Sequence, residues 1–169
     1  MTGPTRGPGS VYSGENCAAT VLGGNYPQST QSRLIRIDPF TVPGAGQNPR
    51  LRFQHWYKFG INASGQVQIK TDGGSWEPIS PSYSGSSGGI WTRPYIDLSP
   101  YAGQSVQIAF YFSSDIYSTD VGWYIDDVVL ITGGVVFNNP EDWESGLGDW
   151  GAETGTWEVG VPTSGPGSA

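Results

Sequence analysis

Alternation of apolar and polar residues is the clearest pattern along this chain. In residues 51–59 the odd positions, from Leu51 to Phe59, are apolar or aromatic apart from His55, whereas most even positions are polar. A period of two residues is typical of a β-strand with one face in a core and the other partly in water. The pattern therefore predicts a strand here, with its odd-numbered side chains pointing inward.

Other segments with a strand pattern are separated by stretches rich in glycine, proline and serine. Asp72-Gly73 between two of them has the composition of a tight hairpin turn. Residues 80–89 are rich in serine and glycine, which predicts a loop. No segment shows a convincing period of 3.6 residues. The remaining predicted strands are residues 17–22, 34–42, 66–70, 75–79, 91–98, 105–113 and 121–132.

Composition supports an all-β fold. The 169 residues include 26 Gly and 13 Pro, both of which oppose helix interiors, while aromatic residues make up 13% of the chain and supply a core that disordered chains lack. No apolar run reaches the roughly 18 residues of a membrane span. A net charge of −7 with eight basic residues argues against nucleic acid as a partner. The expected class is an antiparallel sandwich of two sheets.

A short internal repeat links the two ends of the sequence. The heptapeptide starting at Pro4 recurs at Pro162, with six of seven positions identical and an offset of 158 residues. We interpret this as one repeat of 158 residues followed by the start of another.

Several motifs together resemble the MAM-like jelly-roll module, whose bacterial versions occur in secreted peptidases and multidomain surface proteins. The two most specific are the Asp-Leu-Ser-Pro-Tyr-Ala-Gly-Gln-Ser stretch from Asp97 and the Gly-Trp-Tyr-Ile-Asp-Asp-Val stretch from Gly122. The resemblance implies a two-sheet antiparallel jelly-roll β-sandwich and an extracellular location. The opening strands of the family stand last in this sequence, so the module is circularly permuted. The other matching segments are residues 7–10, 16–26, 32–34, 51–57, 71–76, 91, 143–150 and 155–157.

The permutation divides the chain into a jelly-roll body, residues 1–132, and a C-terminal segment, residues 133–169. The body lacks the opening strands, which leaves backbone groups unpaired at an edge. The C-terminal segment folds back onto its own body, inserts into a neighbouring copy, or belongs to a covalent tandem array; the sequence leaves these alternatives open. Its expected apolar anchors are Phe137, Trp143, Leu147, Trp150 and Trp157.

Catalysis is not expected. The chain has one cysteine and one histidine. Cys17 stands beside two alanines without a basic neighbour to lower its pKa, which favours a small buried residue. His55 lies on the inward face of its strand and is expected to be a hydrogen-bonded packing residue. The acidic residues show no spacing that singles out a general acid and a nucleophile.

Two adjacent carboxylates suggest a metal site. Asp126 and Asp127 interrupt an otherwise apolar strand, where a carboxylate is costly to bury unless it is paired or binds a cation. The resemblance implies a structural calcium ion, with ligands from Asn16, Glu144 and one or both of these aspartates. In the alternative interpretation, the aspartates only cap loops or accept hydrogen bonds from backbone amides.

Aromatic residues near polar ones also suggest a glycan site, because sugar rings stack on exposed aromatic side chains. The candidates are Arg52, Trp56, Trp91 and Tyr95; the alternative is that the tryptophans belong to the core. The sequence thus predicts a non-catalytic subunit of an extracellular filament or tandem array, with identical subunits or neighbouring repeats as partners. The alternative function is a polysaccharide- or substrate-binding accessory module of a secreted hydrolase or peptidase.

Overall fold

The structure is a computed structural model that describes residues 7–134, 141–147, 150–151 and 157–161. Sheet A contains β1 (Ala18–Ala19), β4 (Arg50–Lys58), β8 (Tyr95–Asp97) and β10 (Gly122–Ile131). Sheet B contains β2 (Gln31–Ile35), β3 (Phe40–Thr41), β5 (Ser64–Thr71), β6 (Glu77–Pro78), β7 (Tyr83–Ser84) and β9 (Ser105–Ser113). Two short 3₁₀ turns, η1 (Ala45–Gln47) and η2 (Ser99–Tyr101), complete the regular structure of these residues.

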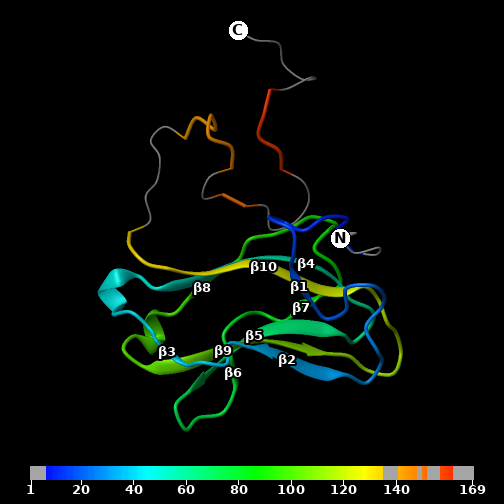
Figure 1. The fold of residues 1–169 in the computed structure, drawn as a ribbon, viewed down its shortest axis with the longest axis horizontal. Coiled ribbons are helices and arrows are strands. Elements are labelled where there is room, and N and C mark those ends of the chain that lie inside the picture. The colour runs from blue at the N-terminus through cyan, green and yellow to red at the C-terminus, as the bar shows by residue number, and fades with distance from the viewer. Residues whose placement is uncertain (1–6, 135–140, 148–149, 152–156, 162–169) are drawn as a thin grey trace.

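All strand pairs within both sheets are antiparallel. Sheet A has the order β1-β10-β4-β8, and sheet B has the order β2-β9-β5-β6, with β3 also paired to β9 and β7 to β5. The sheets form the two layers seen in Figure 1. The predicted two-sheet antiparallel β-sandwich is confirmed. No helix among the described residues has the length and apolar character needed to cross a membrane.

The predicted strands agree with the structure best where alternation is longest. Residues 105–113 form β9 as predicted, and residues 51–59 are displaced by one residue from β4. The predicted strand 34–42 is wrong as one element, because it is divided into β2 and β3 around Pro39, which has no amide proton to donate to the ladder. Part of the predicted loop 80–89 forms the short strand β7.

The main core lies between the sheets and follows the predicted alternation of β4. Leu51, Phe53 and Phe59 are almost completely buried there, and Phe53 meets Phe110 of β9 edge to face, with ring centroids 5.0 Å apart. The apolar side chains at alternate positions of β9 are all buried in this core: Val106, Ile108, Phe110 and Phe112. Burial of such side chains contributes about 1.5–3 kcal/mol each. The core therefore supplies most of the stabilisation of the sandwich.

A second apolar cluster covers the outer face of sheet A. Trp56 and Tyr124 pack edge to face, with centroids 5.7 Å apart, and Cys17 packs against them. The expectation that the even-numbered face of residues 51–59 lies partly in water is wrong at Gln54 and Trp56, which are 5% and 6% exposed. The N-terminal segment lies on this face: a Cβ at Gly7 would stand 2.8 Å from the Tyr124 ring.

A β-bulge interrupts β10 at the two aspartates. The register against β4 shifts between Asp126 and Val129, and Asp127 has a φ of 44°. Before the bulge, Trp123 and Ile125 point into the core, whereas Val128 and Leu130 line the inner side after it. The extra residue thus changes which positions face inward, as bulges do.

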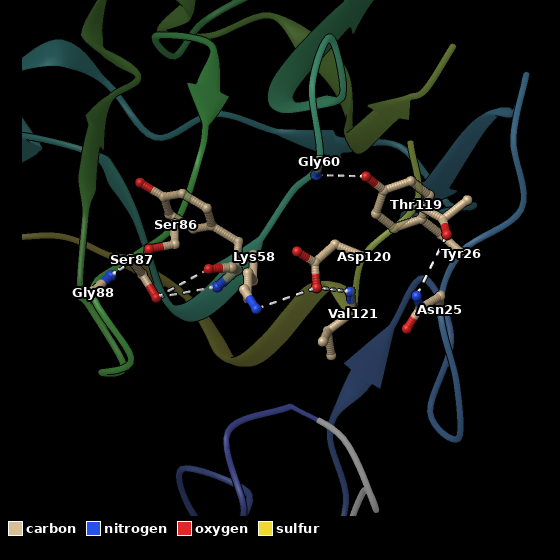
Figure 2. Close-up of polar contacts among 11 residues, drawn as sticks. Asn25, Tyr26, Lys58, Gly60, Ser86, Ser87, Gly88, Thr119, Asp120 and Val121 are labelled. Atoms are coloured by element: carbon tan, nitrogen blue, oxygen red, sulfur yellow. Dashed lines mark hydrogen bonds and ion pairs between the residues drawn. The ribbon is translucent and has the colours of Figure 1, made fainter. Parts of the chain in front are cut away.

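Loops at one end of the sandwich are tied together by polar contacts, shown in Figure 2. The Gly60 amide donates to the Tyr26 hydroxyl over 2.7 Å, and the Tyr26 amide donates to the Asp120 carbonyl. Lys58 Nζ lies 3.6 Å from Asp120 Oδ1. Tyr26 is 1% exposed, so its hydroxyl places a hydrogen-bond acceptor inside a region that water does not reach.

Candidate functional site

His55 is a core residue. It is 2% exposed, and its ring meets those of Phe53, Tyr57 and Tyr83 at centroid distances of 5.3, 5.1 and 4.6 Å. The Trp123 indole Nε1 donates a hydrogen bond to its Nδ1 over 3.2 Å. Burial lowers the His55 pKa to about 3, so the ring is neutral at physiological pH. The sequence-based assignment as a hydrogen-bonded packing residue is confirmed.

Cys17 is half-buried beside the outer cluster of sheet A. Its pKa is raised by burial and, to a smaller extent, by the Asp126 carboxylate. A thiol with a raised pKa is a poor nucleophile. This environment agrees with the prediction of a small apolar residue.

The two aspartates among the predicted metal ligands contact the N-terminal segment. Asp126 Oδ2 accepts hydrogen bonds from the amides of Tyr12 and Ser13 over 3.1 and 3.3 Å, and Asp127 Oδ1 accepts one from the Ser13 hydroxyl over 2.7 Å. In the part of the chain that the structure describes, no three acidic, histidine or cysteine side chains form a group able to hold a metal ion.

Glu144 therefore does not join these aspartates, and Asn16 lies in an exposed part of the N-terminal segment. Hydrogen bonds to the N-terminal segment account for both aspartates. Calcium binding stays a prediction.

The four predicted glycan-contact residues occupy different environments. Trp56 is 6% exposed and packs against Tyr124, so its ring presents no open platform. Arg52 and Tyr95 are paired across β4 and β8, and Tyr95 is 40% exposed. Trp91 is half-buried and lies with a different set of side chains.

That set forms a cleft of about 200 Å³ on the outer side of sheet A, which we call the aromatic cleft. The Tyr12 and Trp91 rings meet edge to face, with centroids 6.1 Å apart, and the Trp91 indole donates to the Ser10 carbonyl over 3.3 Å. Arg93 donates to the Trp150 carbonyl. The lining consists of Tyr12, Gln54, Ile90, Trp91, Arg93, Leu147, Trp150, Gly151, Trp157 and Glu158.

The sequence-based site missed Tyr12 and Arg93. Arg93 follows Trp91 by two residues, and this spacing places both on one side of an extended chain. That signal was present in the sequence. The approach of Tyr12 depends on the path of the N-terminal segment over sheet A, for which no local pattern exists.

The predicted anchors of the C-terminal segment are exposed in this chain. Trp143, Trp150 and Trp157 are 39%, 44% and 75% exposed, and Leu147 is 37% exposed. They border a hollow of about 550 Å³, in which the Trp143 and Trp150 rings lie 5.4 Å apart. The described parts of residues 141–161 lie beyond sheet A, on the side away from sheet B (Figure 1). Phe137 lies outside the described residues.

These anchors therefore do not fill the core between the sheets of their own chain. Fold and site together define a β-sandwich with an aromatic cleft on the outer side of one sheet. The resemblance noted in the sequence implied an association with secreted peptidases, and comparison with known proteins agrees with it.

The chain is similar to parts of larger proteases. It is 37% identical over 129 residues to Bacillopeptidase F of Bacillus subtilis (strain 168), which is 75% of this chain and 9% of the relative. It is 30% identical over 118 residues to the pre-pro-metalloprotease PrtV of Vibrio cholerae serotype O1 (strain M66-2), which is 63% of this chain and 12% of the relative. The aligned region is thus about a tenth of each relative. No family model matches the chain.

Proposed function

We propose that this chain is a non-catalytic accessory module of an extracellular peptidase. The observation that carries the proposal is the partial match to two proteases, in which the aligned region is 9% and 12% of the length. A region of this size is one domain of a multidomain chain. The name of the Vibrio relative describes a precursor with pre and pro segments, which is typical of exported proteases.

The side chains of the module support the non-catalytic assignment. Its one histidine is neutral and in contact with core aromatic rings, and its one cysteine has a raised pKa. A general base must reach the proton that it abstracts. His55 reaches Trp123 instead.

We further propose that the aromatic cleft binds a saccharide. Trp91 and Tyr12 of the body offer aromatic surface, and Arg93 supplies hydrogen-bond donors at the same place. Ligand sites commonly combine apolar walls with a few polar groups in this way. Bound saccharide would hold the attached peptidase near a glycan-containing surface.

A retention assay on insoluble chitin, cellulose and peptidoglycan tests this proposal. We expect the purified chain to be retained on at least one polymer and Trp91→Ala to lose at least about tenfold in affinity, equal to about 1.4 kcal/mol. Trp76→Ala is the matched control, because Trp76 precedes β6 on sheet B and contacts Arg33 rather than the cleft.

Equal retention of the two variants, or no retention of the parent chain, would contradict the saccharide site. Retention on immobilised casein alone would show that the chain binds a polypeptide rather than a saccharide. Casein hydrolysis by the purified chain would overturn the accessory assignment. The predicted role as a filament subunit depends on a different surface and stays a prediction.

A further inference from the structure

A groove opens along one edge of the sandwich, between β2 and the last part of β10; we call it the edge groove. It measures about 510 Å³ and has apolar walls from both sheets. Leu34 of β2 and Val128 of β10 are 53% and 51% exposed at its rim, while Ile108 and Phe110 of β9 form its floor. A second hollow of about 210 Å³ shares Leu34 and Phe110 with it and extends along β1.

Backbone groups are unpaired on both sides of this groove. Among the described residues, β2 pairs with β9 alone, and β1 pairs with β10 only at Tyr124 and Ile125. The outer edge of β10 from Asp126 to Ile131 therefore has no partner strand within the described part of the chain. Two open strand edges beside exposed apolar side chains form a site for an added strand.

We propose that the edge groove binds residues 135–161 of a second copy of this chain as added β-structure. The segment begins with Val135, Val136 and Phe137, which suit a strand against apolar walls. Residues 135–161 directly follow Gly133 and Gly134, which lie just after the end of β10 in the copy that supplies the segment. Added main-chain hydrogen bonds would pair the free edges, and Phe137 would cover the exposed leucine and valine side chains.

Charge supports this occupant. Residues 135–161 contain no arginine or lysine, and their acidic residues are Glu141, Asp142, Glu144, Asp149, Glu153 and Glu158. The linings of the two hollows contain Arg33 and Arg36 and no acidic residue. An acidic segment therefore meets Arg33 and Arg36 in the linings, which favours association between copies, while Asp126 and Asp127 beside the groove accept hydrogen bonds from the N-terminal segment.

The internal repeat and the position of the chain's own segment favour a second copy. Residues 135–161 stand directly before the second heptapeptide. Shortly after the first heptapeptide, the amides of Tyr12 and Ser13 donate hydrogen bonds to Asp126 beside the edge groove. A segment that precedes a heptapeptide is therefore expected close to this groove. The described parts of the same segment in its own chain lie against Arg93 on the outer side of sheet A. The contact is head-to-tail, so each copy offers one segment and one groove.

Complementation between two variants tests this inference in the full chain. Leu34→Glu places a charge in the groove and leaves the segment intact, whereas Phe137→Asp alters the segment and leaves the groove intact. We expect the parent chain to form dimers or longer chains in light scattering, and each variant alone to be monomeric. The mixed variants should form a heterodimer, because the intact groove of the Phe137→Asp variant can bind the intact segment of the Leu34→Glu variant.

Ile61→Glu is the control, because Ile61 is an exposed apolar residue, at 70%, outside the groove. It should associate like the parent chain. A parent chain that is monomeric at every concentration, or variants that stay monomeric when mixed, would overturn the inference. Circular dichroism establishes that each variant is folded.

Crosslinking gives an answer that does not depend on disruptive charges. In a Cys17→Ser background, the double variant Leu34→Cys, Val135→Cys should form disulfide-linked dimers or longer chains on oxidation. A monomer with an internal disulfide would show that the chain's own segment fills the groove, and would overturn the proposal. Absence of any disulfide would overturn it as well.

Discussion

The indole of Trp123 donates a hydrogen bond to Nδ1 of His55 over 3.2 Å, in the core between the sheets. The two residues belong to β10 and β4, which are paired in sheet A. The acceptor nitrogen must be unprotonated, so the bond fixes the neutral tautomer with its proton on Nε2. One side-chain contact thus connects core packing with the protonation state of the chain's one histidine.

Acid should destabilise the fold through His55. Its pKa is 6.5 in an exposed state and about 3 in the folded state, so the unfolded chain binds the additional proton between these values. Stability is then fully present above pH 6.5 and falls as the pH decreases toward 3, by about 1.4 kcal/mol per pH unit. Urea unfolding at several pH values measures this slope.

The matched variant for this experiment is His55→Gln, which retains an acceptor for the Trp123 indole. The two proteins share every other titratable group, including Tyr57 and Tyr83, which face His55. The difference between the two stability curves therefore isolates the histidine. Parallel curves would refute the prediction.

Gly65 should not tolerate a side chain. A Cβ at this position would lie 2.5 Å from the Trp123 ring, so Gly65→Ala forces the core apart. We expect a loss of about 1–3 kcal/mol in the free energy of unfolding. Gly46→Ala is the control, because a Cβ there meets nothing within 4 Å. Similar losses for the two variants would show that Trp123 moves at little cost.

The hydroxyl of Tyr26 should stabilise the loop end of the sandwich. Tyr26→Phe removes the acceptor for the Gly60 amide in a buried setting, and we expect a loss of about 1 kcal/mol in thermal or urea unfolding. Tyr117→Phe changes a ring that is 72% exposed and should be neutral. Equal stability of all three proteins would mean that water replaces the lost acceptor.

Asp126 should hold the N-terminal segment without help from a metal ion. Asp126→Ala removes the acceptor for the Tyr12 and Ser13 amides, and we expect a lower Tm and faster proteolysis before residue 18. Comparison with and without calcium distinguishes the two interpretations of this carboxylate. A loss of Tm that is the same in calcium and in chelator supports hydrogen bonding alone, whereas a loss confined to calcium would support the calcium site.

Sequence by itself determined the class of fold and the inward faces of its longest strands. The alternation in β4 and β9 follows from the geometry of a strand, which places every second side chain on the same face. It also determined the environment of His55, because the neighbouring odd positions are aromatic.

Tertiary structure decided the rest. Trp56 is buried beside Tyr124 on the outer face of sheet A, and the bulge at Asp126 and Asp127 changes which positions of β10 face inward. The aromatic cleft joins Tyr12, Trp91 and Trp157, which are far apart in the sequence. The edge groove exists because β2 and the last part of β10 each have one edge without a partner strand among the described residues. Local patterns report which face of a strand is apolar, but contacts between distant segments depend on how the whole chain packs.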